Sequence, residues 1–143
     1  MMKSLLKKSF NPGNYSEGLS IAFLIFRVAV GIFMLTHGFG KLKMLLAGGP
    51  IQFLDPIGLG PTISLILVVF AEFACSIFLI LGLATRFSAV TLMVTMLVAG
   101  LIFHAAHPFS AKELAFLYAA VYFVIAFTGA GKYSLDSLIS KKL

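Results

Sequence analysis

Charge and cysteine are both scarce in this sequence. Only 11% of its 143 residues are charged and five residues are acidic, whereas 60% are hydrophobic. The mean hydropathy is +1.05. A soluble domain of this size needs far more charge to cover its surface. A single cysteine, Cys75, excludes an intrachain disulfide and a Cys-x-x-Cys metal or redox motif. We therefore expect a membrane protein in which any electron chemistry belongs to a bound molecule or to a partner.

Four long apolar segments occupy most of the chain, at about residues 18–40, 61–83, 87–106 and 111–128. An α-helix of about 20 residues, rising ~1.5 Å per residue, crosses the roughly 30 Å hydrocarbon core of a bilayer. The segments are continuously apolar and lack the alternation of apolar and polar residues that marks a lipid-facing barrel. The predicted fold is therefore all-α, an integral membrane four-helix bundle that forms a single transmembrane domain over residues 1–143.

The connections between these segments differ in character. Residues 41–60 are rich in glycine and proline but include Ile51, Phe53 and Leu54, so they are too apolar for a solvated loop and too broken to span. We expect them to form a lid in the membrane interface. The other two connections are short, which makes consecutive helices antiparallel neighbours. Ser110 and Glu113 have the spacing of a capping box, which predicts that the last helix opens there.

The basic residues predict the orientation of the bundle. With four spans, one side of the membrane carries seven lysines and arginines and the other side carries three, Lys41, Lys43 and Lys112. The positive-inside rule assigns the richer side, which includes both termini, to the cytoplasm. The net charge of +6 comes from short clusters beside apolar segments, without the interleaved aromatic residues of a nucleic-acid surface. We therefore expect the lipid bilayer, and no nucleic acid, as a partner.

Two charged residues lie well inside the predicted spans. Arg27 is about one third of the way into the first helix, and Glu72 is near the middle of the second. A charged side chain at mid-membrane costs on the order of 3 kcal/mol on insertion scales, so each needs a partner or a purpose. The sequence predicts an intramembrane ion pair between Arg27 and Glu72 that docks the two helices. The alternative is a carboxylate that serves a proton or ligand path.

A second polar group gathers at the extracytoplasmic ends of three helices. His37 and Lys41 lie a turn apart where the first helix ends, His104 lies where the third ends, and Glu113 lies where the fourth begins. We expect these four residues to line one small-molecule pocket under the lid, or else to form a polar plug that closes the bundle. His107 is interpreted as an interfacial anchor. No HxxxH or HxH spacing fixes a metal geometry, so no metal is predicted.

Several stretches of this chain together resemble one family of small membrane proteins. These stretches are Arg27–Gly31, Thr36–Lys41, Leu79–Arg86 and Gly129–Asp136, along with Glu72 and Glu113. As a set they resemble the DoxX family, and the resemblance covers about residues 20–138. It implies a multi-pass four-helix bundle in the inner (cytoplasmic) membrane of a bacterium.

The resemblance also implies a class of function. The family takes its name from small subunits of a terminal quinol oxidase and of a thiosulfate:quinone oxidoreductase, and other members resemble parts of oxidative-stress complexes. We therefore expect a membrane subunit of a quinone-linked oxidoreductase or oxidative-stress complex, with a quinone as the candidate cofactor and a protein partner or a second copy beside it. Two alternatives stay open, a structural or assembly subunit without chemistry and a small carrier or channel. The resemblance does not decide whether the chain is itself an enzyme.

Overall fold

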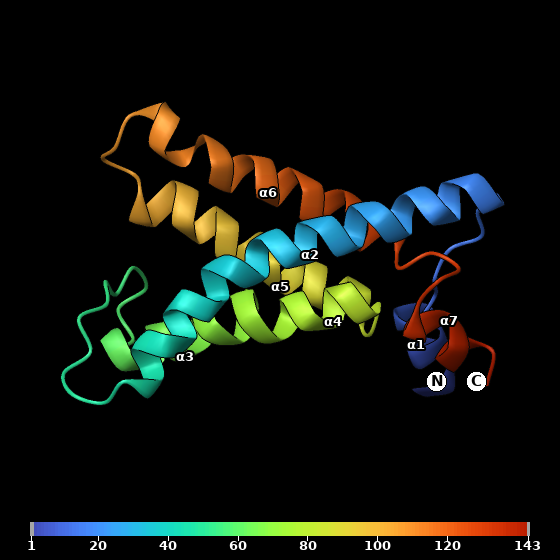
Figure 1. Ribbon diagram of the computed structural model, residues 1–143, viewed down its shortest axis with the longest axis horizontal. Coiled ribbons are helices and arrows are strands. Elements are labelled where there is room, and N and C mark those ends of the chain that lie inside the picture. Colours follow the sequence, from blue (N-terminus) through green and yellow to red (C-terminus); the bar gives the residue numbers. More distant parts are fainter. Residues whose placement is uncertain (1, 143) are drawn as a thin grey trace.

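The computed structural model describes residues 2–142, and these residues form helices and loops without a β-strand. Four helical segments are long and apolar enough to cross a membrane, which confirms the predicted fold class (Figure 1). The first is α2 (Glu17–Leu46) and the last is α6 (Phe109–Thr128). The second span joins α3 (Pro61–Val69), the π-helix η1 (Phe70–Cys75) and α4 (Ser76–Leu81). The third joins α5 (Thr85–Val98) and the π-helix η2 (Ala99–Phe103).

Two helix boundaries differ from the sequence prediction. Helix α2 continues to Leu46, so Lys41 is helical and the loop before α3 covers only residues 47–60. Helix α6 begins at Phe109 with Pro108 as its N-cap, so the capping box of Ser110 and Glu113 does not form. Pro108 has an extended ψ of 157°, and its fixed φ and missing N–H suit the start of a helix better than its interior.

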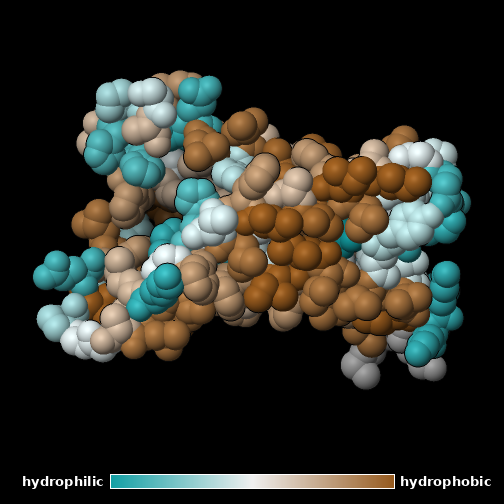
Figure 2. Space-filling model, in the orientation of Figure 1, coloured by the Kyte–Doolittle hydropathy of each residue, from teal (hydrophilic) through white to brown (hydrophobic). Residues whose placement is uncertain are grey.

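The spans follow one another in space as they do in the sequence. Helix α2 packs along the second span, α5 packs against η1 and α4, and α6 packs on α5 and η2. Large and small apolar side chains from all four spans form the core, including Met34, Leu79, Leu92 and Tyr122. On the face shown in Figure 2, hydrophobic residues cover most of the middle of the molecule and hydrophilic residues gather toward both ends, as expected for a protein surrounded by hydrocarbon.

Two short helices that the sequence analysis did not predict lie side by side at the end where both termini meet (Figure 1), α1 (Met2–Ser9) and α7 (Leu135–Ser140). We call this the terminal end, and the opposite end, with the 47–60 loop and the turn at 104–108, the loop end. Asp136 fastens α7 to the spans. Its buried carboxylate accepts hydrogen bonds from the backbone N–H groups of Ala84 (2.7 Å) and Thr85 (2.9 Å), where α5 begins. The carboxylate therefore satisfies donors that the first turn of a helix leaves unpaired.

Removal of the Asp136 carboxylate should destabilise the bundle. Asp136→Ala leaves two N–H groups at the start of α5 without their acceptor, and we expect a loss of about 1–3 kcal/mol in the free energy of unfolding. Asp136→Asn keeps one carbonyl acceptor and should lose less. Thermal unfolding of both variants in mild detergent measures the difference. An unchanged melting temperature in Asp136→Ala would show that α5 does not depend on this cap.

Both termini should lie in the cytoplasm. The structure brings the two termini to the same end, and the surplus of lysine and arginine at that end predicts its side of the membrane. A fluorescent-protein fusion at the C-terminus should therefore be bright, and alkaline phosphatase inserted after Gly49 in the 47–60 loop should be active. Phosphatase activity from the C-terminal fusion, with none from the loop insertion, would reverse the assignment.

Candidate functional site

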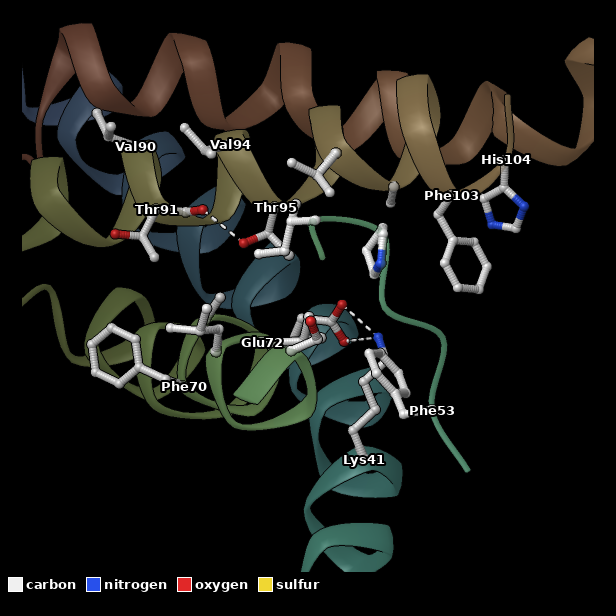
Figure 3. A pocket seen from close by; sticks show the side chains of 18 of the residues that line it. Lys41, Phe53, Phe70, Glu72, Val90, Thr91, Val94, Thr95, Phe103 and His104 are labelled. Atoms are coloured by element: carbon white, nitrogen blue, oxygen red, sulfur yellow. Dashed lines mark hydrogen bonds and ion pairs between the residues drawn. The ribbon is translucent and has the colours of Figure 1, made fainter. Parts of the chain in front are cut away.

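A cavity of about 660 Å³ lies between the second and third spans. Both π-helical segments contribute to its wall, η1 through Phe70, Ala71 and Glu72, and η2 through Ala99 and Phe103. Figure 3 shows Glu72 and Phe70 across the cavity from the side chains of the third span. A π-helical turn changes which side chains face a neighbouring helix, and such turns occur frequently at functional sites. The two departures from α-helical geometry therefore coincide with one cavity.

Apolar side chains make most of the cavity wall. On the two spans these include Leu67, Val68, Phe87, Val90, Val94 and Val98. Phe53, Pro56 and Ile57 of the 47–60 loop complete the wall at the loop end. Leu67 and Val94 are about half exposed on the outer surface of the bundle, which hydrocarbon surrounds in a membrane. The cavity therefore opens sideways toward lipid, and a lipid-soluble molecule has direct access to it.

Asp55 organises the loop that reaches this cavity. Its carboxylate accepts hydrogen bonds from the Leu59 N–H (3.0 Å), the Gly60 N–H (2.7 Å) and the Ser64 hydroxyl (2.6 Å). The Ser64 hydroxyl and the Gly60 N–H lower the pKa of Asp55 below its usual value, so the carboxylate stays charged at neutral pH. These bonds tie the loop to the first turn of α3. The position of the loop in the membrane interface stays a prediction.

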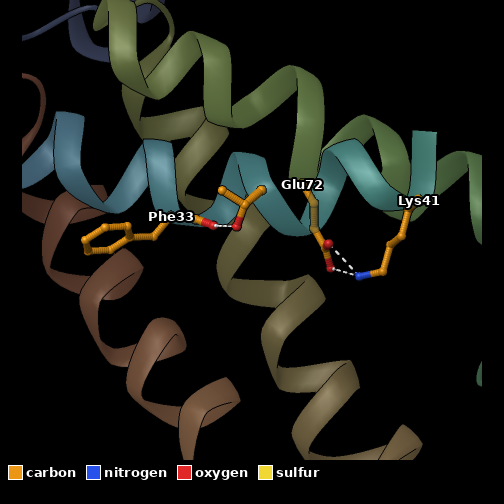
Figure 4. A network of polar contacts seen from close by, with 4 residues as sticks. Phe33, Lys41 and Glu72 are labelled. Atoms are coloured by element: carbon orange, nitrogen blue, oxygen red, sulfur yellow. Dashed lines mark hydrogen bonds and ion pairs between the residues drawn. The ribbon is translucent and has the colours of Figure 1, made fainter. Parts of the chain in front are cut away.

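One ion pair supplies the charge in the cavity. Lys41 on α2 places its Nζ 2.5 Å from both carboxylate oxygens of Glu72 (Figure 4). The Glu72 side chain is only 4% exposed, whereas that of Lys41 is 29% exposed. A carboxylate in a low-dielectric environment is costly unless it is paired and hydrogen-bonded. Lys41 therefore keeps a buried carboxylate in the wall of an otherwise apolar cavity.

Gly38 allows α2 to come close to this carboxylate. Helix α2 touches η1 at Gly38, where an added Cβ would lie 2.5 Å from the Glu72 carbonyl oxygen and 2.6 Å from the Phe73 nitrogen. Neither backbone atom can move aside without shifting a helix. The missing side chain at Gly38 thus brings the two backbones together one turn before Lys41. Close contact here gives the lysine side chain its reach to Glu72.

The predicted ion pair between Arg27 and Glu72 is wrong. The Arg27 guanidinium is buried, but it donates to the backbone carbonyls of Leu79 (2.9 Å) and Tyr133 (2.8 Å) at the terminal end. Leu79 lies in the last turn of α4, and its carbonyl also accepts a hydrogen bond from the Gly82 N–H (3.1 Å) at the helix end. Because α2 and the second span are antiparallel, Arg27 lies opposite the end of α4 and not opposite Glu72. Arg27 therefore joins α2, α4 and the C-terminal segment.

The structure brings two of the four predicted pocket residues to the cavity. Lys41 and His104 line it, whereas His37 and Glu113 do not and are exposed. The His37 ring lies 6.4 Å from the Tyr118 ring, toward α6. Within residues 2–142, no group of three His, Cys, Asp or Glu side chains is placed to hold a metal ion. The ligand-binding roles of the four residues stay predictions.

Some features of the site were not predicted from the sequence. Thr91 and Thr95, one turn apart, line the cavity, but their hydroxyls bond to the carbonyls of Phe87 and Thr91 in their own helix. Two threonines at this spacing in an apolar span are the only sequence signal of that face. The reach of the long Lys41 side chain toward the membrane interior was also overlooked. Nothing in the residue types marks the two π-helical turns.

The two partners of the ion pair should differ in their effect on stability. Lys41→Met strands the buried Glu72 and should cost about 2–4 kcal/mol, whereas Glu72→Gln leaves a lysine that can turn toward water at the loop end and should cost less. The double variant Lys41→Met/Glu72→Gln should be more stable than Lys41→Met alone. Thermal unfolding in detergent tests this order.

The chain offers a matched control for this experiment. The pair of Lys132 and Glu17 has the same Nζ to carboxylate distance, 2.5 Å, but each side chain is 56% exposed. Because water screens an exposed pair, Lys132→Met should leave the melting temperature nearly unchanged. Equal losses in Lys41→Met and Lys132→Met would show that burial does not set the strength of the Lys41–Glu72 pair.

Comparison with known proteins identifies the family. The chain is 28% identical over 126 residues to the inner membrane protein YqjF of Escherichia coli (strain K12), an alignment that covers 85% of this chain and 95% of that protein. No solved structure matches it significantly. This relative and the four apolar helices indicate a multi-pass protein of the bacterial inner membrane, as predicted. The family model named DoxX matches residues 22–105, more than half of the sequence, so the chain belongs to the DoxX family.

Proposed function

We propose that this protein is the membrane subunit of a quinone-linked oxidoreductase and that it binds a quinone in the cavity between its second and third spans. The observation that carries the proposal is the Lys41–Glu72 pair in the wall of a cavity that is otherwise mostly apolar and open to lipid. A quinone has a polar ring with two carbonyl groups and a lipid-soluble tail. The cavity offers both of the environments that such a molecule needs.

The volume and the walls suit this ligand. Small-molecule sites usually measure about 300–1,000 Å³ and combine apolar walls with a few polar groups. The observed volume of about 660 Å³ lies within this range. Leu67 and Val94 line the cavity and are also exposed to lipid, so a tail can extend past them into the bilayer while the ring stays inside.

The polar groups can orient a quinone ring. An ammonium group has three N–H donors, and Lys41 uses two of them for the Glu72 oxygens, which leaves one for a ligand carbonyl. His104 lines the same cavity and can donate to a second carbonyl or give up a proton. Glu72 can accept or release the proton that accompanies a change in quinone redox state. Figure 3 shows these three side chains near the loop end of the cavity.

Mass spectrometry of the protein purified in mild detergent tests the proposal. The wild type should carry quinone, whereas Thr95→Phe, which adds a ring inside the cavity, should carry at least about tenfold less. Glu72→Gln should also lower the occupancy, because the Lys41 ammonium loses its partner and changes position. Val124→Phe on α6 is the matched control, since Val124 is exposed to lipid and lies outside the cavity lining.

The alternatives predict other results. A structural subunit would purify with a partner protein and without quinone, and a carrier would produce solute flux in proteoliposomes. Quinone absent from the wild type, or equally abundant in Thr95→Phe and the control, would overturn the proposal. Equal amounts in both variants would indicate that the quinone is merely dissolved in the detergent micelle.

A further inference from the structure

Two histidines contact each other at the loop end of the cavity. The Nδ1 atoms of His104 and His107 are 3.3 Å apart, and the rings meet edge to face. His104 is the C-cap of η2, and the backbone N–H of His107 donates to the His104 carbonyl (3.0 Å), which closes the turn between them. The contact therefore rests on a hydrogen-bonded turn as well as on two side chains.

The two rings lie in different environments. His104 is half-buried and lines the cavity, whereas His107 is exposed beyond it at the loop end. The His104 ring also packs against the Phe103 ring in an edge-to-face arrangement, with the centroids 4.7 Å apart. His104 thus reaches the cavity, His107 reaches water, and the contact between their Nδ1 atoms joins the two rings. The sequence interpretation of His107 as an interfacial anchor does not account for this contact.

Imidazole suits proton transfer between two such environments. Its two nitrogens can accept a proton on one side of the ring and release a proton on the other, and its ordinary pKa is near neutrality. A proton taken from water at Nε2 of His107 leaves through Nδ1 to Nδ1 of His104. His104 then releases the proton on its own Nε2. Each ring regains its first tautomer by losing a proton from one nitrogen and gaining a proton on the other in exchange with water.

The charged groups that the structure describes near His104 and His107 have other partners or are exposed, and none forms a salt bridge with either histidine. Lys112 at the start of α6 donates to the Ala105 carbonyl (3.2 Å) within the same turn, and Glu113 beside it is exposed. Across the cavity, Lys41 and Glu72 neutralise each other. Among residues 2–142, no carboxylate lies within salt-bridge distance of either histidine ring.

We propose that His107 and His104 form a relay that carries protons between water at the loop end and the ligand in the cavity. This inference rests on the proposed quinone function. A quinone takes up two electrons and two protons to become a quinol, and the relay supplies or removes protons only. The electrons come from a redox centre of a partner subunit, and the relay connects the ligand to water at the loop end.

Voltammetry of the full chain in nanodiscs on an electrode tests the relay, because the electrode supplies the electrons. The probe is a ubiquinone with a decyl tail, and protein-free nanodiscs give the background. His107→Ala should keep the same amount of bound quinone, since His107 does not line the cavity, but proton-coupled reduction should slow by about 10². Imidazole in solution should restore the rate, because the lost ring was exposed to water.

His37→Ala is the matched control, because His37 is an exposed histidine near the loop end that lies outside the cavity. It should reduce quinone at the wild-type rate and show no response to imidazole. A normal rate in His107→Ala with quinone bound, or a slowed rate that imidazole does not restore, would overturn the relay alone. Loss of quinone from both His107→Ala and His107→Gln would do the same, since His107 would then be needed to form the site. A wild type without bound quinone would overturn the proposed function together with the relay.

Discussion

Hydrocarbon cannot solvate a charge, so every ionised group inside the spans must find its partner within the protein. Glu72 meets this requirement through Lys41, and Arg27 meets it through two backbone carbonyls. These two sets of contacts lie at different positions along α2. Lys41 ties this helix to the second span near the loop end, and Arg27 does so at the terminal end. These polar contacts set the register of α2 on its neighbour, which lipid-facing apolar side chains cannot specify.

The cavity follows from the same register. Close approach at Gly38 brings α2 against η1, and the π-helical turn there carries Glu72 in the cavity wall. On the third span, η2 ends at His104, which lines the same cavity. Backbone irregularity in a membrane is tolerated where it is buried in protein or borders a cavity, and both π-helical turns obey this rule. The polar part of the site is therefore inseparable from the way the helices dock.

The terminal end shows how distant segments become one unit. The turn around Gly82 receives Arg27 from α2 and Asp136 from the C-terminal segment, and a Cβ at Gly82 would collide with the guanidinium. Gly82 has a left-handed φ of 67° as well, so both its conformation and its neighbour require glycine. Three of the segments that resemble the DoxX family thus meet at one place. Their role there is to join helix ends, which separates them from the cavity at the other end.

Hydropathy and length determined the four spans from the sequence alone, because continuous apolar segments of about 20 residues have one stable arrangement in a bilayer. Charge scarcity likewise marked Arg27 and Glu72 as residues that need a partner, and Lys41 as a candidate pocket residue. The choice of partner was decided only in three dimensions. The Lys41 side chain on α2 reaches Glu72 because of the packing at Gly38 and the π-helical turn of η1. Neither feature leaves a periodic signal in the sequence. Local sequence patterns indicate which polar groups need a partner, whereas the docking of the helices decides which partner each group finds.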